Sequence, residues 1–290
     1  MGIWDDLKLQ YRIGGVVQKI LFWNIGVSLC FLILKTFLSS VYSSLLPWFG
    51  LSSNYIDLLF APWTLVSYSF LHAGIIHLLF NLLVLHFVGR MFTTYFTQRQ
   101  FATVYFCGAV IGGLFYLLGA MFFSVGSILV GASAAIMAPL IALAVYAPYM
   151  EVRLALIGYV KMWHIAAFII VLDVIQLSTQ NTGGHLSHLG GAFMGFLYIK
   201  LLNQGVDISK KIDSWQHSVI ALFKKKSRTP FKKVYVSKQK TARKTNSAAN
   251  KAFEKTVEQK KIDEILDKIS RSGYESLTKE EKDFLFKVGK

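Results

Sequence analysis

The stretch ILVGASAAIMAPLIALAVYAP, residues 128–148, carries one serine, Ser133, among small residues at the start of a long apolar run. Gly131 precedes that serine, and glycine adopts backbone angles that other residues avoid, so we expect a sharp turn into a helix here. A serine at a helix start is most often an N-cap. The same place offers free backbone N–H groups and the positive end of the helix dipole, which can bind an oxyanion. This stretch alone favours the cap, and the rest of the chain must decide.

Long apolar runs indicate a membrane protein. The chain has 290 residues, 54% of them hydrophobic, and several runs approach or exceed the ~20 residues that a membrane-crossing helix needs. The first run, 20–46, is too long and too far from the N-terminus for the core of a signal peptide, so we expect a retained span. The predicted fold class is all-α, a bundle of six transmembrane helices. The predicted spans are 20–46, 76–96, 101–123, 128–148, 155–179 and 185–203.

The segments before and inside this membrane domain have a different character. Residues 1–19 are predicted to form an amphipathic lead-in at the cytoplasmic surface. Residues 20–203 form the predicted six-span membrane domain. Its segment 47–75 is rich in aromatic residues but broken by proline and glycine, which is typical of an interfacial segment and not of a span.

The C-terminal part is polar and basic. Residues 204–250 are rich in lysine and are predicted to be a disordered linker. Residues 251–290 regain helical spacing of apolar residues, with Gly273 ending one helix. Thr278 and Glu281 have the spacing of a capping box for a second helix. We therefore expect a small cytosolic helical hairpin at this end of the chain.

The charge of the chain is concentrated in this tail. The formal net charge is +15, and residues 201–290 hold 22 Lys and Arg against 11 Asp and Glu. A basic segment beside a membrane span more often faces anionic lipid than nucleic acid. The run also lacks aromatic residues at the spacing of a nucleic-acid module. We therefore expect membrane lipid and no nucleic acid as a partner.

The basic residues also predict the orientation in the membrane. Loops 47–75, 124–127 and 180–187 contain no Lys or Arg, whereas the other ends of the spans do. This alternation predicts that both termini are cytosolic. No transit peptide is recognised, so the expected location is a bacterial cytoplasmic (inner) membrane, with the chain as a multi-pass protein. The cations on the predicted cytosolic side before the tail are Lys8, Arg12, Lys19, Arg90, Arg99, Arg153 and Lys161.

Polar residues inside spans are costly, and three of the predicted spans place them near the same end. His77 and Asn81 lie four residues apart in the second span, Ser133 lies in the fourth and His188 in the sixth. All three spans run from outside to inside. At 1.5 Å of rise per residue, these side chains lie roughly 3–10 Å below the outer boundary. Unrelated buried polar residues would not be expected to share one level.

The residue types at this level fit nucleophilic catalysis. A serine hydroxyl is a weak nucleophile until a base takes its proton, and a neutral imidazole is the usual base. The sequence therefore predicts Ser133 as nucleophile and His188 as base. Polar hydrogens beside the serine could stabilise a developing oxyanion. The predicted donors and substrate-binding positions are His77, Asn81 and the backbone around Gly131 and Ala132.

Small residues would let the helices that carry this pair approach each other. The sixth span contains Gly191-x-x-x-Gly195, and the fourth is lined with alanine. Ordinary helix packing is the more frequent use of such a pattern. Here a Ser–His hydrogen bond of ~2.6–3.2 Å requires the same close approach.

At this point the chain resembles the rhomboid family of intramembrane serine proteases. Residues 77–81, HLLFN, resemble the family's His-x-x-x-Asn motif, and residues 131–134, GASA, resemble its Gly-x-Ser-Gly motif. Residues 188–195 resemble its His-x-x-Gly-x-x-x-Gly motif. The order of the motifs and the number of spans also match, and the resemblance covers about residues 55–203.

The resemblance implies a Ser133–His188 dyad without an acid, a metal or a cofactor. It implies that His77, Asn81 and the backbone near Ser133 stabilise the oxyanion. The implied substrates are membrane-anchored proteins cleaved near the outer face of the membrane, and the fifth span with segment 47–75 would flank substrate access.

Four positions depart from the family pattern and keep an alternative open. Ala134 replaces a glycine beside the serine, and Met137 replaces an aromatic residue one turn later. Thr64 stands where the family has an arginine after Trp63, and Ser187 replaces an alanine. The alternative is a catalytically inactive rhomboid-like protein that binds transmembrane segments as a chaperone or regulator.

The remaining polar residues carry weaker signals. Asp173 in the fifth span invites a triad, but an interhelical hydrogen bond or a protonated acid is favoured. His185 is predicted to be a loop residue that faces away from His188. No metal-ligand spacing is recognised. The histidines without spaced partners are His72, His86 and His164.

Overall fold

The computed structural model describes residues 2–154, 157–178, 181–214 and 261–288, most of them in helices. The chain divides into two compact units, Met1–Lys226 and Ser227–Lys290. In chain order the elements of the first unit are α1 (Ile3–Ile13), α2 (Val16–Phe37), α3 (Ser39–Phe49), β1 (Leu51–Ser52), α4 (Asp57–Phe60), α5 (Thr64–Ser67), η1 (Tyr68–Phe70), α6 (Ile75–Tyr95), α7 (Gln98–Ala120), β2 (Ile128–Leu129), α8 (Ser133–Tyr146), β3 (Glu151–Leu154), β4 (Gly158–Lys161), α9 (Met162–Gln176) and α10 (Thr182–Asn203).

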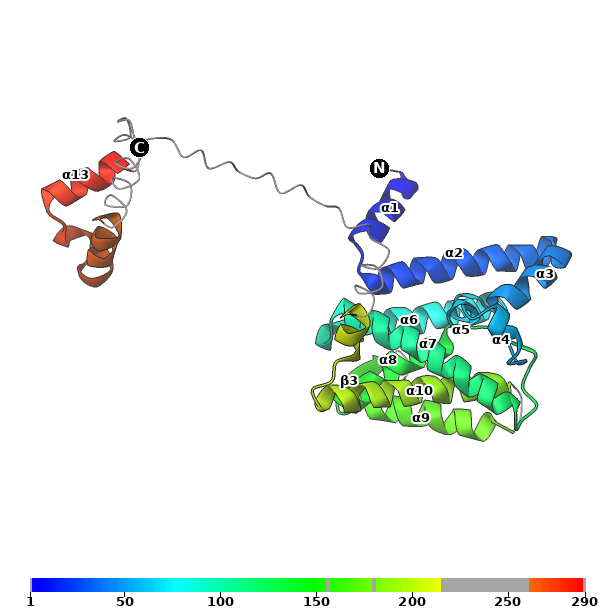
Figure 1. The fold of residues 1–290 in the computed structure, drawn as a ribbon. Helices are drawn as coiled ribbons and strands as arrows, with labels where there is room; N and C mark the ends of the chain where they lie inside the picture. The colour runs from blue at the N-terminus through cyan, green and yellow to red at the C-terminus, as the bar shows by residue number, and fades with distance from the viewer. Residues whose placement is uncertain (1, 155–156, 179–180, 215–260, 289–290) are drawn as a thin grey trace, which may run out of the picture. The chain divides into compact units, whose positions relative to one another are not determined.

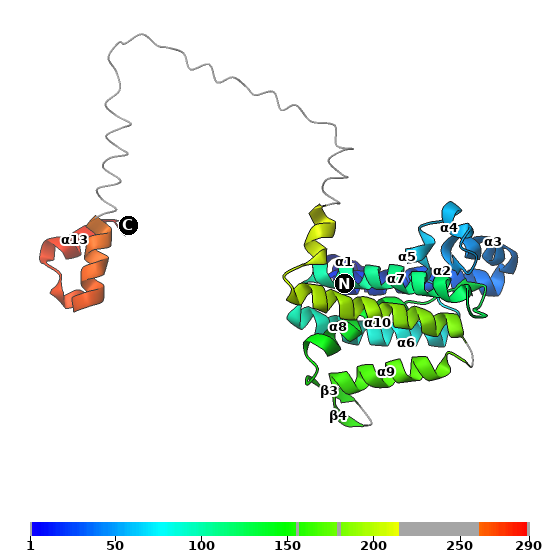
Figure 2. The same cartoon turned by 60° about the horizontal axis from the view of Figure 1, so that its bottom comes forward.

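The long helices of the first unit run side by side as a bundle (Figure 1). Helix α8 is its core, because α6, α7, α9 and α10 all pack against it and every residue from Ala134 to Ala144 is buried. Helix α2 packs on α6 and α7. Helix α9 lies at the edge of the bundle beside α10 (Figure 2). The buried helix therefore begins with the serine that the sequence singled out.

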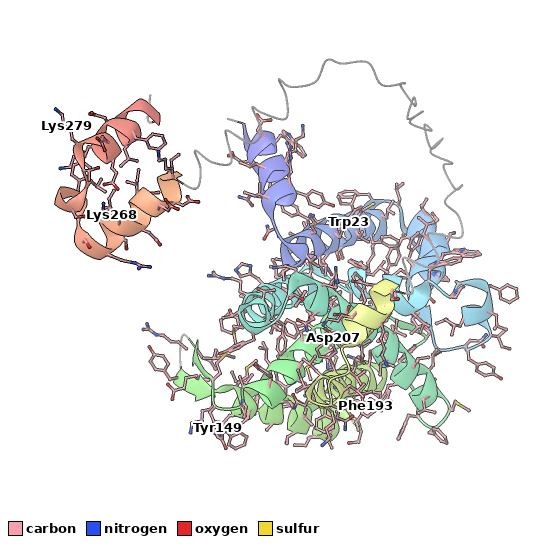
Figure 3. The ribbon with its side chains drawn as sticks, turned by 60° about the vertical axis from the view of Figure 1, so that its left-hand side comes forward. Trp23, Tyr149, Phe193, Asp207, Lys268 and Lys279 are labelled. Carbon is pink, nitrogen blue, oxygen red and sulfur yellow. The ribbon has the colours of Figure 1, made fainter. Side chains whose placement is uncertain are left out.

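The surface of this unit suits a lipid environment. Large apolar side chains such as Trp23 and Phe193 are exposed and lie on its outer faces (Figure 3). Three helices, α2, α6 and α7, are long and apolar enough to cross a membrane, and α8 and α9 are shorter apolar helices. Exposed apolar area on this scale is typical of a surface that contacts another apolar phase.

The prediction of a single span over 20–46 is wrong in its bounds. Helix α2 begins at Val16, so the predicted lead-in 1–19 ends too late. It stops at Phe37, because Leu38 leaves the helical region with φ −136° and ψ 58°. Helix α3 then begins at Ser39. The serine-rich run 39–44 provides hydroxyls that bond back to carbonyls one turn earlier, which average hydropathy does not register.

The bounds of three later predicted spans also need correction. Residues 128–132 lead into α8 and do not belong to it. Within the predicted span 155–179, residues 158–161 form β4, which pairs antiparallel with β3 just before the span; Gly158 has φ +91°, and α9 begins only at Met162. Residues 155, 156 and 179 lie outside the described residues. Helix α10 begins at Thr182, so most of the predicted loop 180–187 is helical.

The segment 47–75 is a folded connection built of short elements. Trp63 donates its indole N–H to the Trp48 carbonyl at 2.7 Å, and the two exposed rings stack with centroids 6.3 Å apart. Strand β1 pairs with β2 antiparallel, Leu51 opposite Leu129. This pairing fixes the chain immediately before α8 and so helps to set the position of Ser133.

The basic segment after α10 begins with structure. Residues 208–214 are helical, so the predicted disordered linker 204–250 is wrong over its first residues. Asp213 forms an ion pair with Arg99 at 2.5 Å, which ties this short helix to the start of α7. Residues 215–260, with the rest of that linker and the start of the predicted hairpin, lie outside the described residues.

The second unit is a pair of helices. Residues 261–272 are helical, Gly273 follows at φ +78°, and η2 (Tyr274–Ser276) and α13 (Lys279–Val288) complete the unit. The Thr278 N–H donates to Glu281 Oε2 at 2.7 Å, and the Glu281 N–H donates to Thr278 Oγ1 at 3.3 Å. The capping box expected from the sequence is therefore present.

Candidate active site

Ser133 is the first residue of α8, and Ala132, fully buried, occupies the N-cap position. The interpretation of Ser133 as the cap itself is therefore wrong, and its hydroxyl is free for another role. Gly131 has φ +135°, and its N–H bonds to the Tyr68 carbonyl at 3.0 Å. The N–H groups of the first helical turn have no acceptor within their own helix. The turn thus presents a hydroxyl beside backbone donors that their own helix leaves available.

The Ser133 hydroxyl meets an imidazole from another helix. His188 Nε2 on α10 lies 2.6 Å from Ser133 Oγ. This is the contact expected from the shared depth of the two residues. It has the length at which a base can take a hydroxyl proton directly.

Glycines make this distance possible. A Cβ on Gly191 would overlap the Ala134 carbonyl, and one on Gly195 would overlap the Ala138 carbonyl. The backbones of α8 and α10 are therefore in contact at both positions. This confirms the packing predicted from Gly-x-x-x-Gly, and any larger residue at either position would push His188 away from Ser133.

The departure at Ala134 is accommodated away from the serine. A Cβ on Gly112 of α7 would lie 2.7 Å from the Ala134 Cβ. Because Gly112 has no side chain, the alanine methyl fits against the backbone of α7. Met137, one turn after Ser133, is buried and lines the cavity beside the site. Neither residue stands between the hydroxyl and the imidazole.

Asp173 of α9 contacts the other side of the same imidazole. His188 Nδ1 lies 2.9 Å from Asp173 Oδ1, and His185 Nδ1 lies 2.7 Å from that same oxygen. The interhelical hydrogen bond favoured for Asp173 is present, but its partner is the imidazole that contacts Ser133, which is the triad geometry that the sequence disfavoured. The prediction for His185 is wrong, because it lies in α10 three residues before His188, and residues at that spacing share a helix face.

A cavity of about 640 Å³ opens at the Ser133 hydroxyl. His77, Asn81 and Gly131 line it together with Ser133 and His188. A Cβ on Gly131 would lie 2.9 Å from His77 Cε1, so the histidine fills the space beside the glycine. The structure therefore brings together all the predicted site residues except Ala132, which caps the helix behind them.

Two of the residues that line this cavity, Asn81 and His77, also make contacts within the protein. Asn81 donates one amide hydrogen to the His77 carbonyl at 2.8 Å, which leaves its second hydrogen for the cavity. His77 contacts the edge of His72, with ring centroids 5.0 Å apart. His72 Nδ1 is in turn 2.7 Å from Ser28 Oγ of α2. Sequence reasoning missed His72, because it lies in the connection before α6 and its partner lies 44 residues away on α2.

The acid and the two histidines also have the composition of a metal site. Asp173, His185 and His188 offer ligand atoms within 4.8 Å of one another. Carboxylate oxygen and imidazole nitrogen are ligands that zinc accepts. The hydrogen bonds among these atoms already account for their convergence. A metal held by His188 would compete with its contact to the acid.

Comparison with known families agrees with the motifs. The Rhomboid domain family matches residues 59–205, about half of the 290-residue chain. A family of unknown function, DUF6576, matches residues 252–287. No curated protein matches the chain.

Proposed function

Because the chain belongs to the rhomboid family and is a multi-pass membrane protein, we propose that it is an intramembrane serine endopeptidase. The observation that carries the proposal is the 2.6 Å contact between Ser133 Oγ and His188 Nε2 beside a cavity inside the bundle. A membrane-embedded hydroxyl with an imidazole within proton-transfer distance fits acyl transfer better than it fits a purely structural role.

The reaction proceeds through an acyl-enzyme. Ser133 Oγ attacks the carbonyl carbon of the scissile peptide bond while its proton passes to His188 Nε2. The C–N bond then breaks, and the same proton goes to the leaving amine. Water attacks the resulting ester, again giving a proton to His188, and the carboxyl product leaves as Ser133 regains its hydrogen.

Stabilisation of the oxyanion falls to donors that already face the cavity. His77 and Asn81 line the cavity together with Ser133, and the backbone N–H groups at the start of α8 adjoin that serine, so we assign these groups to the developing charge on the carbonyl oxygen. Gly131 leaves room for His77 beside the serine. No metal or cofactor is needed for this chemistry.

The substrate class follows from the lining of the cavity. Apart from the polar site, the cavity is bounded by apolar residues of several helices. An extended segment of a membrane-anchored protein, unwound from its helix, fits such a space, since its backbone could reach Ser133 without leaving the bundle. The apolar lining residues include Phe80, Val84, Ile136, Leu140 and Ile169.

The proposed architecture has six spans, provided by α2, α6, α7, α8, α9 and α10 within residues 16–203. Both termini are cytosolic in a bacterial inner membrane, because Lys and Arg gather at the ends of the helices on the same side as the tail. Ser133 then lies near the outer face. The lead-in, the basic linker and the hairpin at 251–290 form the cytosolic parts, facing anionic lipid.

The test is cleavage of a single-span membrane protein by the purified full chain in proteoliposomes. We expect cleavage by wild type and its loss in Ser133→Ala and in His188→Ala, with cleavage sites mapped to the outer third of the substrate span. A Ser53→Ala variant is a matched control for loss of a hydroxyl elsewhere.

The alternative, an inactive binder of transmembrane segments, predicts a different result. A well-folded wild type would then bind the substrate without cleaving it, and Ala134→Gly would restore cleavage. The position of the Ala134 methyl against Gly112, away from the hydroxyl, argues for the enzyme.

A further inference from the structure

The side chains behind the imidazole extend the site beyond a pair of residues. We infer that Asp173 is a positioning residue for His188, whose carboxylate holds the imidazole in the tautomer that can accept the Ser133 proton. The inference rests on the proposed protease function, which itself requires only Ser133 and His188. It adds a third residue, from a third helix, to the group that prepares the nucleophile.

Asp173 is a buried carboxylate on a largely exposed helix. The Asp173 side chain is 6% exposed and lies on α9, whose neighbouring residues such as Val174 and Ile175 are largely exposed. A buried carboxylate is costly unless it is paired. In the described ranges Asp173 Oδ2 has no hydrogen-bond partner, so the two imidazoles at Oδ1 are its polar contacts there.

The contact with Asp173 decides which ring nitrogen of His188 carries the hydrogen. An ionised carboxylate only accepts, so His188 Nδ1 must donate to Asp173 Oδ1 across their 2.9 Å. A neutral imidazole has one N–H, and with Nδ1 protonated its Nε2 is a bare acceptor. The Ser133 hydroxyl at 2.6 Å then donates to Nε2, which is the direction that general-base catalysis requires.

Asp173 also acts when the Ser133 proton moves. His188 becomes a cation once it takes the Ser133 proton. Its Nδ1–H stays hydrogen-bonded to the Asp173 carboxylate throughout. The carboxylate therefore stabilises the charge that forms next to it, and no proton needs to reach Asp173. This favours the transition state and not the bound substrate, so the effect belongs to kcat.

His185 explains how the acid is held. Its Nδ1 donates to the same oxygen at 2.7 Å from one turn earlier on α10. The carboxylate oxygen thus accepts hydrogen bonds from two N–H donors of α10. These two bonds hold α9, at the edge of the bundle, against the helix that carries His188. The His-x-x-His spacing on α10 opposite one acid on α9 is the sequence signal for this arrangement.

The experiment compares Asp173→Asn with wild type, using the purified full chain. We expect kcat and the rate of Ser133 acylation by a fluorophosphonate to fall about 100-fold, the lower end of what a positioned base contributes. KM should stay within about threefold, and the thermal unfolding midpoint should stay close to that of wild type. Asp173→Glu, which keeps a carboxylate, should recover part of the loss. Val174→Ala, an exposed position on the same helix, should leave all values unchanged.

A direct readout of the tautomer needs no substitution. In the ¹⁵N NMR spectrum of histidine-labelled wild type, His188 Nε2 should show the shift of an unprotonated ring nitrogen, with the hydrogen on Nδ1. Asp173→Asn should shift His188 towards the other tautomer. A role in helix packing alone would lower the unfolding midpoint but would not change this signal.

Three results would overturn the inference: acylation by Asp173→Asn within about threefold of wild type, a loss of stability without a loss of kcat, or a wild-type spectrum with the hydrogen on Nε2. Failure of the proposed function would look different. Wild type itself would then show no acylation of Ser133, and the tautomer spectrum would still decide whether Asp173 sets the hydrogen on His188.

Discussion

At the scale of the single residue, Gly131 shows how backbone conformation and side-chain placement combine at the site. Its φ of +135° lies in a region that residues with a Cβ rarely adopt, and the space a Cβ would occupy is filled by His77. The residue before Ala132 must therefore be a glycine on two independent grounds.

Gly131→Ala tests this position. The strained backbone costs about 1–3 kcal/mol of folding free energy, and the new methyl displaces the His77 ring. We expect a lower unfolding midpoint and at least a tenfold slower acylation of Ser133 by a fluorophosphonate. Gly126→Ala, where the added Cβ meets nothing within 4 Å, is the control. Normal labelling of Gly131→Ala would show that the turn geometry is dispensable.

At the scale of the element, the contact of α8 with α10 decides the distance between the two proposed catalytic groups. Alanine at Gly195 would overlap the Ala138 carbonyl, and the helices can relieve that overlap only by moving apart. The 2.6 Å hydrogen bond lies at one end of this contact.

We therefore expect Gly195→Ala to lower the free energy of unfolding by about 1–3 kcal/mol, the usual cost of overpacking. Substrate cleavage should also fall, although Gly195 lies two turns from His188. Gly26→Ala in α2, with open space around it, should leave both unchanged. Full activity of Gly195→Ala in proteoliposomes would contradict the packing account.

The helical pair at the C-terminal end provides a prediction on pH. The Thr278 backbone N–H and the Lys268 side chain hold the pKa of Glu281 below its ordinary value of 4.5. A lowered pKa in the folded state stabilises that state at pH values above 4.5, and the stabilisation is lost as pH falls through the lowered pKa.

NMR of the full chain in detergent can follow this titration at the Thr278 amide proton. Its shift should change with a midpoint below 4.5, and Glu281→Gln should abolish the change. Glu280→Gln, one residue earlier and without a part in the capping box, should leave it intact. A midpoint at or above 4.5 would mean that the capping box does not favour the charged carboxylate.

At the scale of the whole molecule, the proposed orientation rests on the distribution of charge and can be checked without an activity assay. In intact cells, a membrane-impermeant maleimide should label Tyr55→Cys in the exposed segment before α6 and should not label Ser272→Cys in the tail unit. Labelling of Ser272→Cys should appear once the cells are opened. The reverse pattern would place the site at the cytosolic face.

The contacts that sequence could predict share a physical origin. A serine, a histidine and an asparagine in apolar helices are expensive wherever they lie, so their common depth predicted that Ser133 and His188 would meet. The glycine and alanine spacing predicted the close helices. Both patterns, the polar residues at one depth and the spacing of small residues, can be read along the sequence because the membrane environment constrains them.

The contacts that sequence could not predict depend on side-chain directions between separate helices. The polar run at the start of α10 predicts a loop at His185, because it hides the beginning of that helix. Asp173 could be paired with His188 only once the rotation of α9 was known. The break at Leu38 and the β3–β4 hairpin are local backbone events inside or beside apolar runs, where average hydropathy is insensitive to them.

The central claim is that Ser133 is a nucleophile activated by His188, and the most direct measurement is the mass of the covalent adduct. The purified chain, treated with a fluorophosphonate and digested, should carry one phosphonate on the peptide that contains Ser133, and His188→Ala should carry none. An unmodified Ser133 in a folded, substrate-binding wild type, or equal labelling of His188→Ala, would contradict the account.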